Sequence, residues 1–517
     1  MICANESWRR SRFFGKSKIT MSPFLSTRIV VACFLSSAVV TAFAGPQPPA
    51  PPPLEIPKPP PAQVSSSEGM PPLPYPAVPQ KRQEKKNPPQ PPTLLTKIKS
   101  ADAEDWARTP NDLKGLLEWV SGEMNVHFTS NIKSFGEISS EPTKNPMLYR
   151  SGYKPFTLTA AEIAKIREYV LNGGTVVFNS LVGNPDAYQS ALAAAKAILP
   201  ERNVYRLRMD HPVFHSFYNI DKVAFRDRMV KDGMVTDPYP YLEGVDVDNR
   251  TGIIISRWDF SLGWEANAHD SWGYADNDSR KIGANIVAYA TAMRDAGRSV
   301  GKSVELSDSD KKTAGKFRVG QVIHAGPWKT RTAAFPMLLS ELNKQTGTQV
   351  SFDLKDVALT DAAIFEMPFL FLTGTTDFAL TEPERVNLRK FLNNGGVLFV
   401  EAGEGRVSFD QSFRAEIAQV LPGKALVPLP ANHEIFRQPK SCEVVKARPS
   451  LAAKNGGQID MPPALQGVEL NGALSVIYSP YDCSAGWERA IAPYAIGYEP
   501  QDATALGLNV LYYAVTH

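Results

Sequence analysis

The sequence predicts two tandem α/β domains, each a flavodoxin-like three-layer sandwich with a mostly parallel sheet. Two stretches repeat the same residues 222 to 224 positions apart, which gives domains at 95–297 and 315–517 joined by a linker at 298–314. Within each copy, apolar runs typical of buried strands alternate with amphipathic helical segments. A period of this length indicates a duplicated globular domain, because solenoid units recur at roughly 20 to 50 residues.

The repeat is carried by short anchor motifs in a fixed order. In the first copy they are Phe156-x-Leu-Thr159, Asn172-Gly-Gly174, His211, Asp259-x-Ser-x-Gly-Trp-Glu265 and Gly283-x-Asn285. In the second copy they are Phe378-x-Leu-Thr381, Asn394-Gly-Gly396, His433, Asp482-x-Ser-x-Gly-Trp-Glu488 and Gly507-x-Asn509. We therefore interpret the chain as one domain present twice.

The elements of the second copy follow from its periodicity. Residues 317–324 are strand-like, and 332–344 carry apolar residues at helical spacing. The alternation at 348–354 predicts another strand. Residues 368–373 form a continuous apolar run before Gly374, which is typical of a strand covered on both faces.

The next helix is specified at both ends. Thr381-x-x-Glu384 is a capping box, in which hydroxyl and carboxylate satisfy each other's free backbone donors, and Thr159-x-x-Glu162 repeats it. The Asn-Gly-Gly motif supplies a left-handed stop, and an apolar strand follows at 397–400, or at 176–178 in the first copy. Strand, helix, stop and strand form a βαβ unit, and such units build a mostly parallel sheet covered by helices.

The N-terminus predicts export. Residues 29–44 form an apolar stretch behind Arg28 that ends in Ala42-x-Ala44, which is typical of a signal peptide at 1–44, with Met21 as a possible true start. A retained membrane anchor is the alternative, but these 16 residues fall short of the roughly 20 that a spanning helix needs. We expect an exported protein, periplasmic or secreted, with no transmembrane anchor after cleavage.

Removal of the leader changes the charge and the cysteine content. The chain carries a formal net charge of +3 and the leader holds +5, so the remainder carries −2 and offers no basic surface for nucleic acid. Cys442 and Cys483 remain, and an exported protein can bridge them, although two separate buried thiols are the plain alternative.

Residues 45–94 predict a disordered linker. Of the chain's 43 prolines, 19 lie between positions 46 and 92, so this segment cannot bury a core and forms an extended spacer. It either tethers the domains across an envelope layer or acts as a passive spacer, and composition favours the second.

The ordered motifs resemble the domain of unknown function 4159 family. The resemblance rests on the apolar run at 369–374, the Gly-Gly strand, the Gly-Trp-Glu motif and the closing Gly-x-Asn motif, and it covers nearly all of both copies. It implies a fold like that of class I glutamine amidotransferases, in bacterial envelope proteins, with no established activity. The family usually has acidic residues after the Gly-Gly strand; Glu401 fits this pattern, whereas Asn179 and Ser180 depart from it.

The ends of these strands are where open α/β sheets bind their ligands. An amidotransferase needs a cysteine nucleophile on a sharp strand-to-helix turn, and neither copy has one. Ser180 only imitates such a turn, because Phe178 stands where a glycine is needed. Glu401 and Glu404 are candidate binding residues at this edge.

The Asp-x-Ser-x-Gly-Trp-Glu motif is the strongest local signal. In a binding role, Trp264 and Trp487 would stack on a sugar while Asp482 binds its hydroxyls, with His433 as a further candidate. In a structural role, the glycine permits a tight turn, the indole fills the core, and the aspartate or glutamate caps the following helix. We favour the structural role, because a fold constraint acts on both copies whereas a ligand constraint need act on only one.

His211 and His215 lie four residues apart beside Asp210 and are candidate metal ligands. Pro212 argues against a regular helix there, and the second copy lacks the same set. We predict no cofactor.

Two hypotheses for function follow. The first is a non-catalytic exported envelope protein whose paired domains bind a protein or glycan partner. The second is a hydrolase or amidase-like enzyme acting on envelope carbohydrate or peptide, which requires His211, Asp259 and Glu265 to meet in one cleft. The missing nucleophile favours the first.

Overall fold

The computed structural model describes residues 91–300 and 315–517. The predicted signal peptide and most of the two predicted linkers lie outside the described residues. Both copies, called repeat 1 and repeat 2 below, belong to one compact unit, Lys86–His517. Within the described ranges, no helix has both the length and the apolarity needed to cross a membrane.

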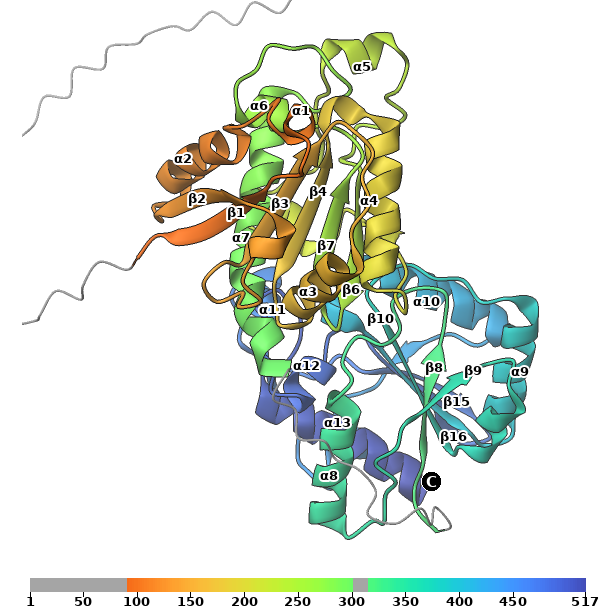
Figure 1. The fold of residues 1–517 in the computed structure, drawn as a ribbon. Coiled ribbons are helices and arrows are strands. Elements are labelled where there is room, and N and C mark those ends of the chain that lie inside the picture. The colour runs from red at the N-terminus through yellow and green to blue at the C-terminus, as the bar shows by residue number, and fades with distance from the viewer. Residues whose placement is uncertain (1–90, 301–314) are drawn as a thin grey trace, which may run out of the picture. The chain divides into compact units, whose positions relative to one another are not determined.

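Repeat 1 alternates strands and helices along the chain (Figure 1). Its strands are β1 Thr93–Ile98, β2 Phe128–Lys133, β3 Met147–Gly152, β4 Thr175–Ser180, β5 Tyr205–Arg206, β6 Leu242–Val247 and β7 Arg250–Ser256. Its helices are α1 Ala103–Trp106, α2 Asp112–Met124, α3 Ala160–Leu171, α4 Pro185–Ile198, α5 Asp227–Lys231, α6 Ser261–Trp264 and α7 Asp276–Val300, with 3-10 turns η1 Phe135–Glu137, η2 Leu181–Gly183 and η3 Pro212–Phe214.

The described strands of repeat 1 form a seven-stranded sheet in the order β2-β1-β3-β4-β7-β6-β5. The first five strands in that order run parallel. β6 pairs antiparallel with β7 and β5 pairs antiparallel with β6, so of these seven strands β6 runs against the rest. One apolar cluster packs α2 and α7 on the sheet through residues such as Leu116 and Ile286. A second packs α3 and α4 through residues such as Ile166 and Ile198. The predicted three layers are confirmed.

Repeat 2 has the same plan. Its strands are β8 Val319–Ile323, β9 Lys355–Ala358, β10 Phe369–Gly374, β11 Val397–Ala402, β12 Val427–Pro428, β13 Val445–Lys446, β14 Asp460–Met461, β15 Gln466–Leu470 and β16 Ala473–Ser479. Its helices are α8 Ala334–Thr346, α9 Glu382–Asn393, α10 Val407–Val420, α11 Pro449–Lys454, α12 Ser484–Trp487 and α13 Pro500–Thr516, with 3-10 turns η4 Ala362–Glu366, η5 Gly403–Gly405 and η6 Glu434–Phe436.

The sheet of repeat 2 matches that of repeat 1 strand by strand. The described strands run in the order β9-β8-β10-β11-β16-β15-β12, and β13 pairs with β14 as a separate ribbon. The register of the last hairpin shifts at the same place in both copies, after Val245 in β6 and after Val468 in β15. The halves of the chain are therefore two copies of one α/β domain.

The local signals at α3 in repeat 1 and at α9 in repeat 2 have the predicted geometry. The backbone N–H of Thr159 donates to Glu162 at 2.9 Å, and that of Thr381 donates to Glu384 at 2.6 Å, so both capping boxes form. The stop uses the left-handed region, with φ of 108° at Gly173. These elements follow from their own residues.

The strand predicted at 348–354 is wrong in its position. Only Val350 makes an isolated bridge there, to Phe317, and the strand β9 begins at Lys355. Phe352 and Leu354 pack against the core without belonging to a strand. The alternating apolar residues at 348–354 are therefore side chains that pack on the core just before the strand. The strand itself begins at Lys355, where the backbone of β8 is available for pairing.

Candidate functional site

The three residues of the enzyme hypothesis have separate surroundings. His211 bonds Thr251, the second residue of β7, whereas Asp259 lies three residues beyond the other end of that strand. The Glu265 carboxylate accepts from the backbone N–H of Asn111 at 2.9 Å. His211 is thus at the opposite end of the sheet from Asp259, and the structure does not bring the three side chains to one cleft.

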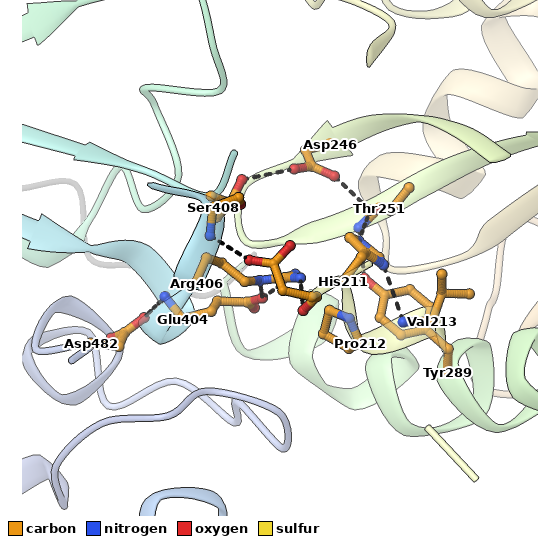
Figure 2. Close-up of polar contacts among 12 residues, drawn as sticks. His211, Pro212, Val213, Asp246, Thr251, Tyr289, Glu404, Arg406, Ser408 and Asp482 are labelled. Atoms are coloured by element: carbon orange, nitrogen blue, oxygen red, sulfur yellow. Dashed lines mark hydrogen bonds and ion pairs between the residues drawn. The ribbon is translucent and has the colours of Figure 1, made fainter. Parts of the chain in front are cut away.

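His211 is a buried, neutral part of the framework. Its Nδ1 accepts from the Val213 N–H at 3.1 Å, which leaves Nε2 to donate to Thr251 Oγ1 at 2.9 Å. The Thr251 hydroxyl donates to Asp246 at 2.6 Å (Figure 2). Burial, and then the charge of Arg406, hold the pKa of His211 well below its usual range. The ring therefore anchors a 3-10 turn and stays uncharged.

The other histidines considered for binding or metal have protein partners. His433 repeats the turn contact, with Nδ1 accepting from the Ile435 N–H at 3.1 Å. The two ring nitrogens of His215 lie 2.5 Å from Asn219 Oδ1 and 2.5 Å from the Met209 carbonyl. In the part of the chain that the structure describes, no group of three or more potential ligands of the His, Cys, Asp and Glu types comes together.

The binding role predicted for the two tryptophans is wrong. Trp264 and Trp487 are each 2% exposed. Their indole N–H groups donate to the carbonyls of Ser279 and Ala503, both at 2.8 Å. A buried ring whose polar atom is satisfied by backbone cannot stack on a ligand, so these residues fill the core as the structural alternative proposed.

The aspartate of the same motif supports a sharp turn at the end of the central strand. Val182 and Glu404, the middle residues of η2 and η5, both have φ of 55°, which is rare for a residue with a side chain and unusual for a β-branched one. The Val182 N–H donates to Asp259 at 3.0 Å, and the Glu404 N–H donates to Asp482 at 2.7 Å. A strand-to-helix elbow therefore exists in each copy. Its central residue lies two positions after the end of the strand, which is Ser180 in repeat 1 and Ala402 in repeat 2.

Neither elbow carries a hydroxyl or thiol nucleophile. Its central residue is valine in repeat 1 and glutamate in repeat 2. Ser180 is the last residue of β4 and is buried. Enzymes with such an elbow have a serine, threonine or cysteine at its centre. Both copies lack these residue types there.

The glutamate and glycine of the motif have structural roles that differ from those predicted. Glu265 and Glu488 accept from the backbone of Asn111 and Ala333, just before α2 and α8, so they cap the helix that precedes the motif in the chain. Gly263 lies inside α6, where a Cβ atom would come within 2.0 Å of the Ser279 hydroxyl. Close helix packing, not a tight turn, requires the glycine there.

Glu401 and Asp482 form a buried carboxyl pair at the edge of repeat 2. The Glu401 Oε2 accepts from the N–H groups of Cys483 and Ser484 at 2.8 and 3.0 Å. Burial, and then the charge of Asp482, raise the pKa of Glu401 to about 7. In repeat 1, Asn179 takes this place and donates its amide to Asp259 at 2.9 Å. These carboxylates are therefore internal supports, out of reach of a ligand.

The predicted disulfide candidate is also corrected. Cys442 and Cys483 are both free and buried. The Cys442 sulfur contacts the Asn509 amide at 3.0 Å, and Cys483 contacts the Ser479 hydroxyl at 3.6 Å. The two thiols belong to separate surroundings, as the second alternative held.

Repeat 1 closes the strand-end edge of repeat 2. Arg406 donates to Glu404 at 2.7 Å and to the backbone carbonyl of Asp210 at 2.8 Å. The carboxylate of Asp210 accepts from the Ser408 N–H at 2.8 Å, in the first turn of α10. Figure 2 shows Glu404, Arg406 and Ser408 facing the segment of His211 from repeat 1. These contacts join the edge of repeat 2 to repeat 1.

Further contacts complete this closure. With the Asn249 amide turned so that its oxygen faces Arg331, that oxygen accepts from both terminal nitrogens at 3.0 and 3.2 Å. The Arg331 side chain is buried, and its Nη2 lies 3.6 Å from Oδ2 of Asp482. Tyr494 of repeat 2 stacks on Tyr289 of repeat 1, with ring centres 5.8 Å apart. Polar and aromatic contacts together hold repeat 1 against this edge.

The same edge of repeat 1 is open and forms a cleft of about 660 Å³, which we call the strand-end pocket. Its floor is the elbow at 181–185. Its walls carry large cationic, imidazole and aromatic side chains: Arg108, Tyr153, Arg228, His269 and Trp272. None of the described residues that line it is acidic. The size and position are those of a ligand site in an open α/β sheet.

Three contacts position the walls of the strand-end pocket. The Arg108 guanidinium lies 4.8 Å from the ring centre of Tyr153, and its Nε donates to the Glu104 carbonyl at 2.9 Å. The Trp272 N–H donates to Asp232 at 2.8 Å. The rings are held in place while the terminal nitrogens of Arg108 remain at the exposed surface.

The family model for a domain of unknown function, DUF4159, matches residues 94–291 and 318–515. The chain belongs to this family. The two matched segments correspond to the two repeats, so the predicted tandem arrangement is confirmed. A search of the curated proteins finds no match.

The two DUF4159 domains differ most where the strand-end pocket lies. Matching backbone contacts and motif spacing align its five wall residues with small or aliphatic ones: Arg108 with Thr330, Tyr153 with Thr375, Arg228 with Ser450, His269 with Ala492 and Trp272 with Ile496. The framework motifs around them are shared. The five side chains are therefore not needed by the fold.

Sequence reasoning missed all five wall residues because it followed what the copies share. The signal that identifies them is a difference between the copies. At these positions, which lie between shared motifs, repeat 1 has a large polar or aromatic residue and repeat 2 has a small or aliphatic one. Most of the predicted site residues, by contrast, belong to the framework that the two copies share.

Proposed function

We propose that this protein is a non-catalytic binding protein, in which the first DUF4159 domain holds an anionic ligand and the second serves as its structural partner. The observation that carries the proposal is the strand-end pocket, which has two arginines, a histidine and two aromatic rings in one copy only. Arginine binds carboxylate and phosphate groups through paired hydrogen bonds, and aromatic walls supply apolar contact. The valine elbow supports binding without catalysis.

Calorimetric titration of the full chain with small anions tests the pocket. Galacturonate, N-acetylglutamate and inorganic phosphate are suitable probes at low salt, since screening weakens such contacts. Arg108→Gln and Arg228→Gln should each reduce affinity for the bound anion roughly tenfold or more, because a charge-assisted hydrogen bond is lost. Arg437→Gln makes the same change of charge at an exposed site of repeat 2 and should have no effect. Equal affinities in all variants would contradict the proposal.

We also propose that the protein is exported and works in the envelope, with a glycan or protein as its partner. The support is the apolar stretch at 29–44 and its Ala42-x-Ala44 end. Sequencing of the N-terminus of the mature protein should begin at Gly45. Ala42→Leu with Ala44→Leu should block processing, since cleavage needs small residues; a mature protein that keeps residue 44 would contradict export by this route.

A further inference from the structure

A second cationic group lies at the sheet edge of repeat 1, outside the strand-end pocket. Arg257 directly follows β7, the strand that pairs with β4. Its guanidinium lies 5.8, 5.6 and 4.6 Å from the ring centres of Tyr188, Tyr241 and Trp258. All three distances are within the range of a cation–π contact. We call these four residues the arginine cage.

The donors of Arg257 are available to a ligand. Over the described ranges, this half-buried guanidinium has aromatic contacts but no ion pair or hydrogen bond to protein. The nearby carboxylate of Glu243 instead accepts from the Tyr188 hydroxyl. Aromatic faces attract the charge without engaging the N–H groups at the edge of the guanidinium plane. The three rings therefore orient the Arg257 guanidinium, and its N–H groups are left to bind an anion.

The arginine cage is one helical turn from the strand-end pocket. Asn184 lines the pocket and Tyr188 forms part of the cage. Residues four apart lie on the same face of a helix, about 5 to 6 Å from each other. The two cationic sites thus flank the first turns of α4.

The cage is also specific to repeat 1. The residues that correspond to Arg257, Tyr188 and Tyr241 are Pro480, Asp410 and Ala464. Pocket and cage are therefore both absent from the closed copy, as expected if they serve one ligand.

We infer that the ligand is an acidic oligosaccharide that places one anionic sugar in the strand-end pocket and another on Arg257. This inference rests on the proposed function and deepens it. Tyr153 and Trp272 line the strand-end pocket and offer ring surface on which a sugar stacks, and the arginines bind the carboxylates. Two linked anionic groups gain affinity because the second binds at high effective concentration.

An acidic peptide fits the site less well. The strand β4 beneath the pocket is paired on both sides, with β3 and β7, so no strand edge is free for an extended peptide. A flexible peptide also loses more conformational entropy on binding than a ring-built sugar chain does.

Titration of the full chain with galacturonate and with tetragalacturonate tests the inference. The tetramer should bind roughly tenfold or more tightly than the monomer, and Arg257→Gln should remove this gain while leaving monomer affinity unchanged. Arg108→Gln should weaken both. Arg414→Gln is the matched control, because Arg414 of repeat 2 also lies over an aromatic ring, 5.3 Å from the centre of Tyr478.

The outcomes separate the two proposals. If the monomer binds but the tetramer gains nothing, or if Arg257→Gln leaves that gain intact, the inference is overturned and the pocket stands. If hexaglutamate matches tetragalacturonate, the ligand is a peptide and the inference is overturned. If maltotetraose matches it, charge is irrelevant and both proposals fall. If neither uronate binds, the inference is overturned, and the proposed function falls with it only if N-acetylglutamate and phosphate also fail to bind.

Discussion

The carboxyl edges of the two sheets share a framework and differ in what covers them. Both have an elbow at φ of 55°, held by the aspartate of the shared motif. In repeat 1 the elbow is the floor of a cleft, whereas in repeat 2 Arg331 and Arg406 fill the corresponding space and bind repeat 1. Both copies thus keep the supports of this edge, and repeat 1 has an open cleft above them.

The first turn of the helix after the elbow shows the same difference in detail. In repeat 1, Asn184 caps α4 by accepting from the Asp186 N–H at 2.8 Å. In repeat 2, Arg406 stands at that position and makes no side-chain cap, and Asp210 of the other repeat supplies the carboxylate. An intramolecular cap in one copy has become a contact between domains in the other.

The largest expected effect is on stability, and it tests whether the buried tryptophan contributes equally to both copies. Trp264→Ala and Trp487→Ala should each lower the free energy of unfolding by about 3 to 5 kcal/mol, because both remove a buried ring. Denaturant titration measures this loss. A surface aromatic, Phe365→Ala, is the control and should change little. An unchanged stability in either tryptophan variant would break the equivalence.

A smaller difference should separate the two helix starts. Arg406→Ala leaves the buried carboxylate of Glu404 without its ion pair and should cost about 3 kcal/mol. Asn184→Ala removes only a cap and should cost about 1 kcal/mol. Equal losses in denaturant titration would mean that the closed edge of repeat 2 contributes no more to stability than the open one.

One pH dependence of stability should arise from Glu401 in repeat 2. The pKa of Glu401 is raised to about 7, above its ordinary value of 4.5, because burial and Asp482 disfavour its charge. Stability from the neutral carboxyl is fully present below pH 4.5 and is lost as pH rises through 7. Glu401→Gln stays neutral, so its melting temperature should rise relative to the parent between pH 5 and 8.

Two variants sharpen the comparison at this position. Asn179→Asp places a second carboxyl beside Asp259 and should give repeat 1 the same loss of stability with rising pH. Glu443→Gln, at an exposed site, should follow the parent at every pH. A constant difference between parent and Glu401→Gln across this range would contradict the buried carboxyl pair.

The parts that sequence predicted well are those encoded locally. The capping box at Thr159 and the stop at Gly173 use residues within one turn of each other, so no distant contact is needed to form them. The elbow at Val182 was missed, because a β-branched residue with positive φ is held there by Asp259, 77 residues away. The walls of the strand-end pocket come from loops between positions 108 and 272, and only the fold assembles them.

The most direct test of the open and closed edges is thiol labelling at one equivalent pair of positions, His269→Cys and Ala492→Cys. His269 is exposed in the strand-end pocket, whereas Ala492 is 6% exposed in the closed copy, and the described native cysteines are buried. The account predicts rapid modification at 269, slowed by a bound uronate, and slow modification at 492 with or without it. Equal labelling rates at the two positions would contradict it.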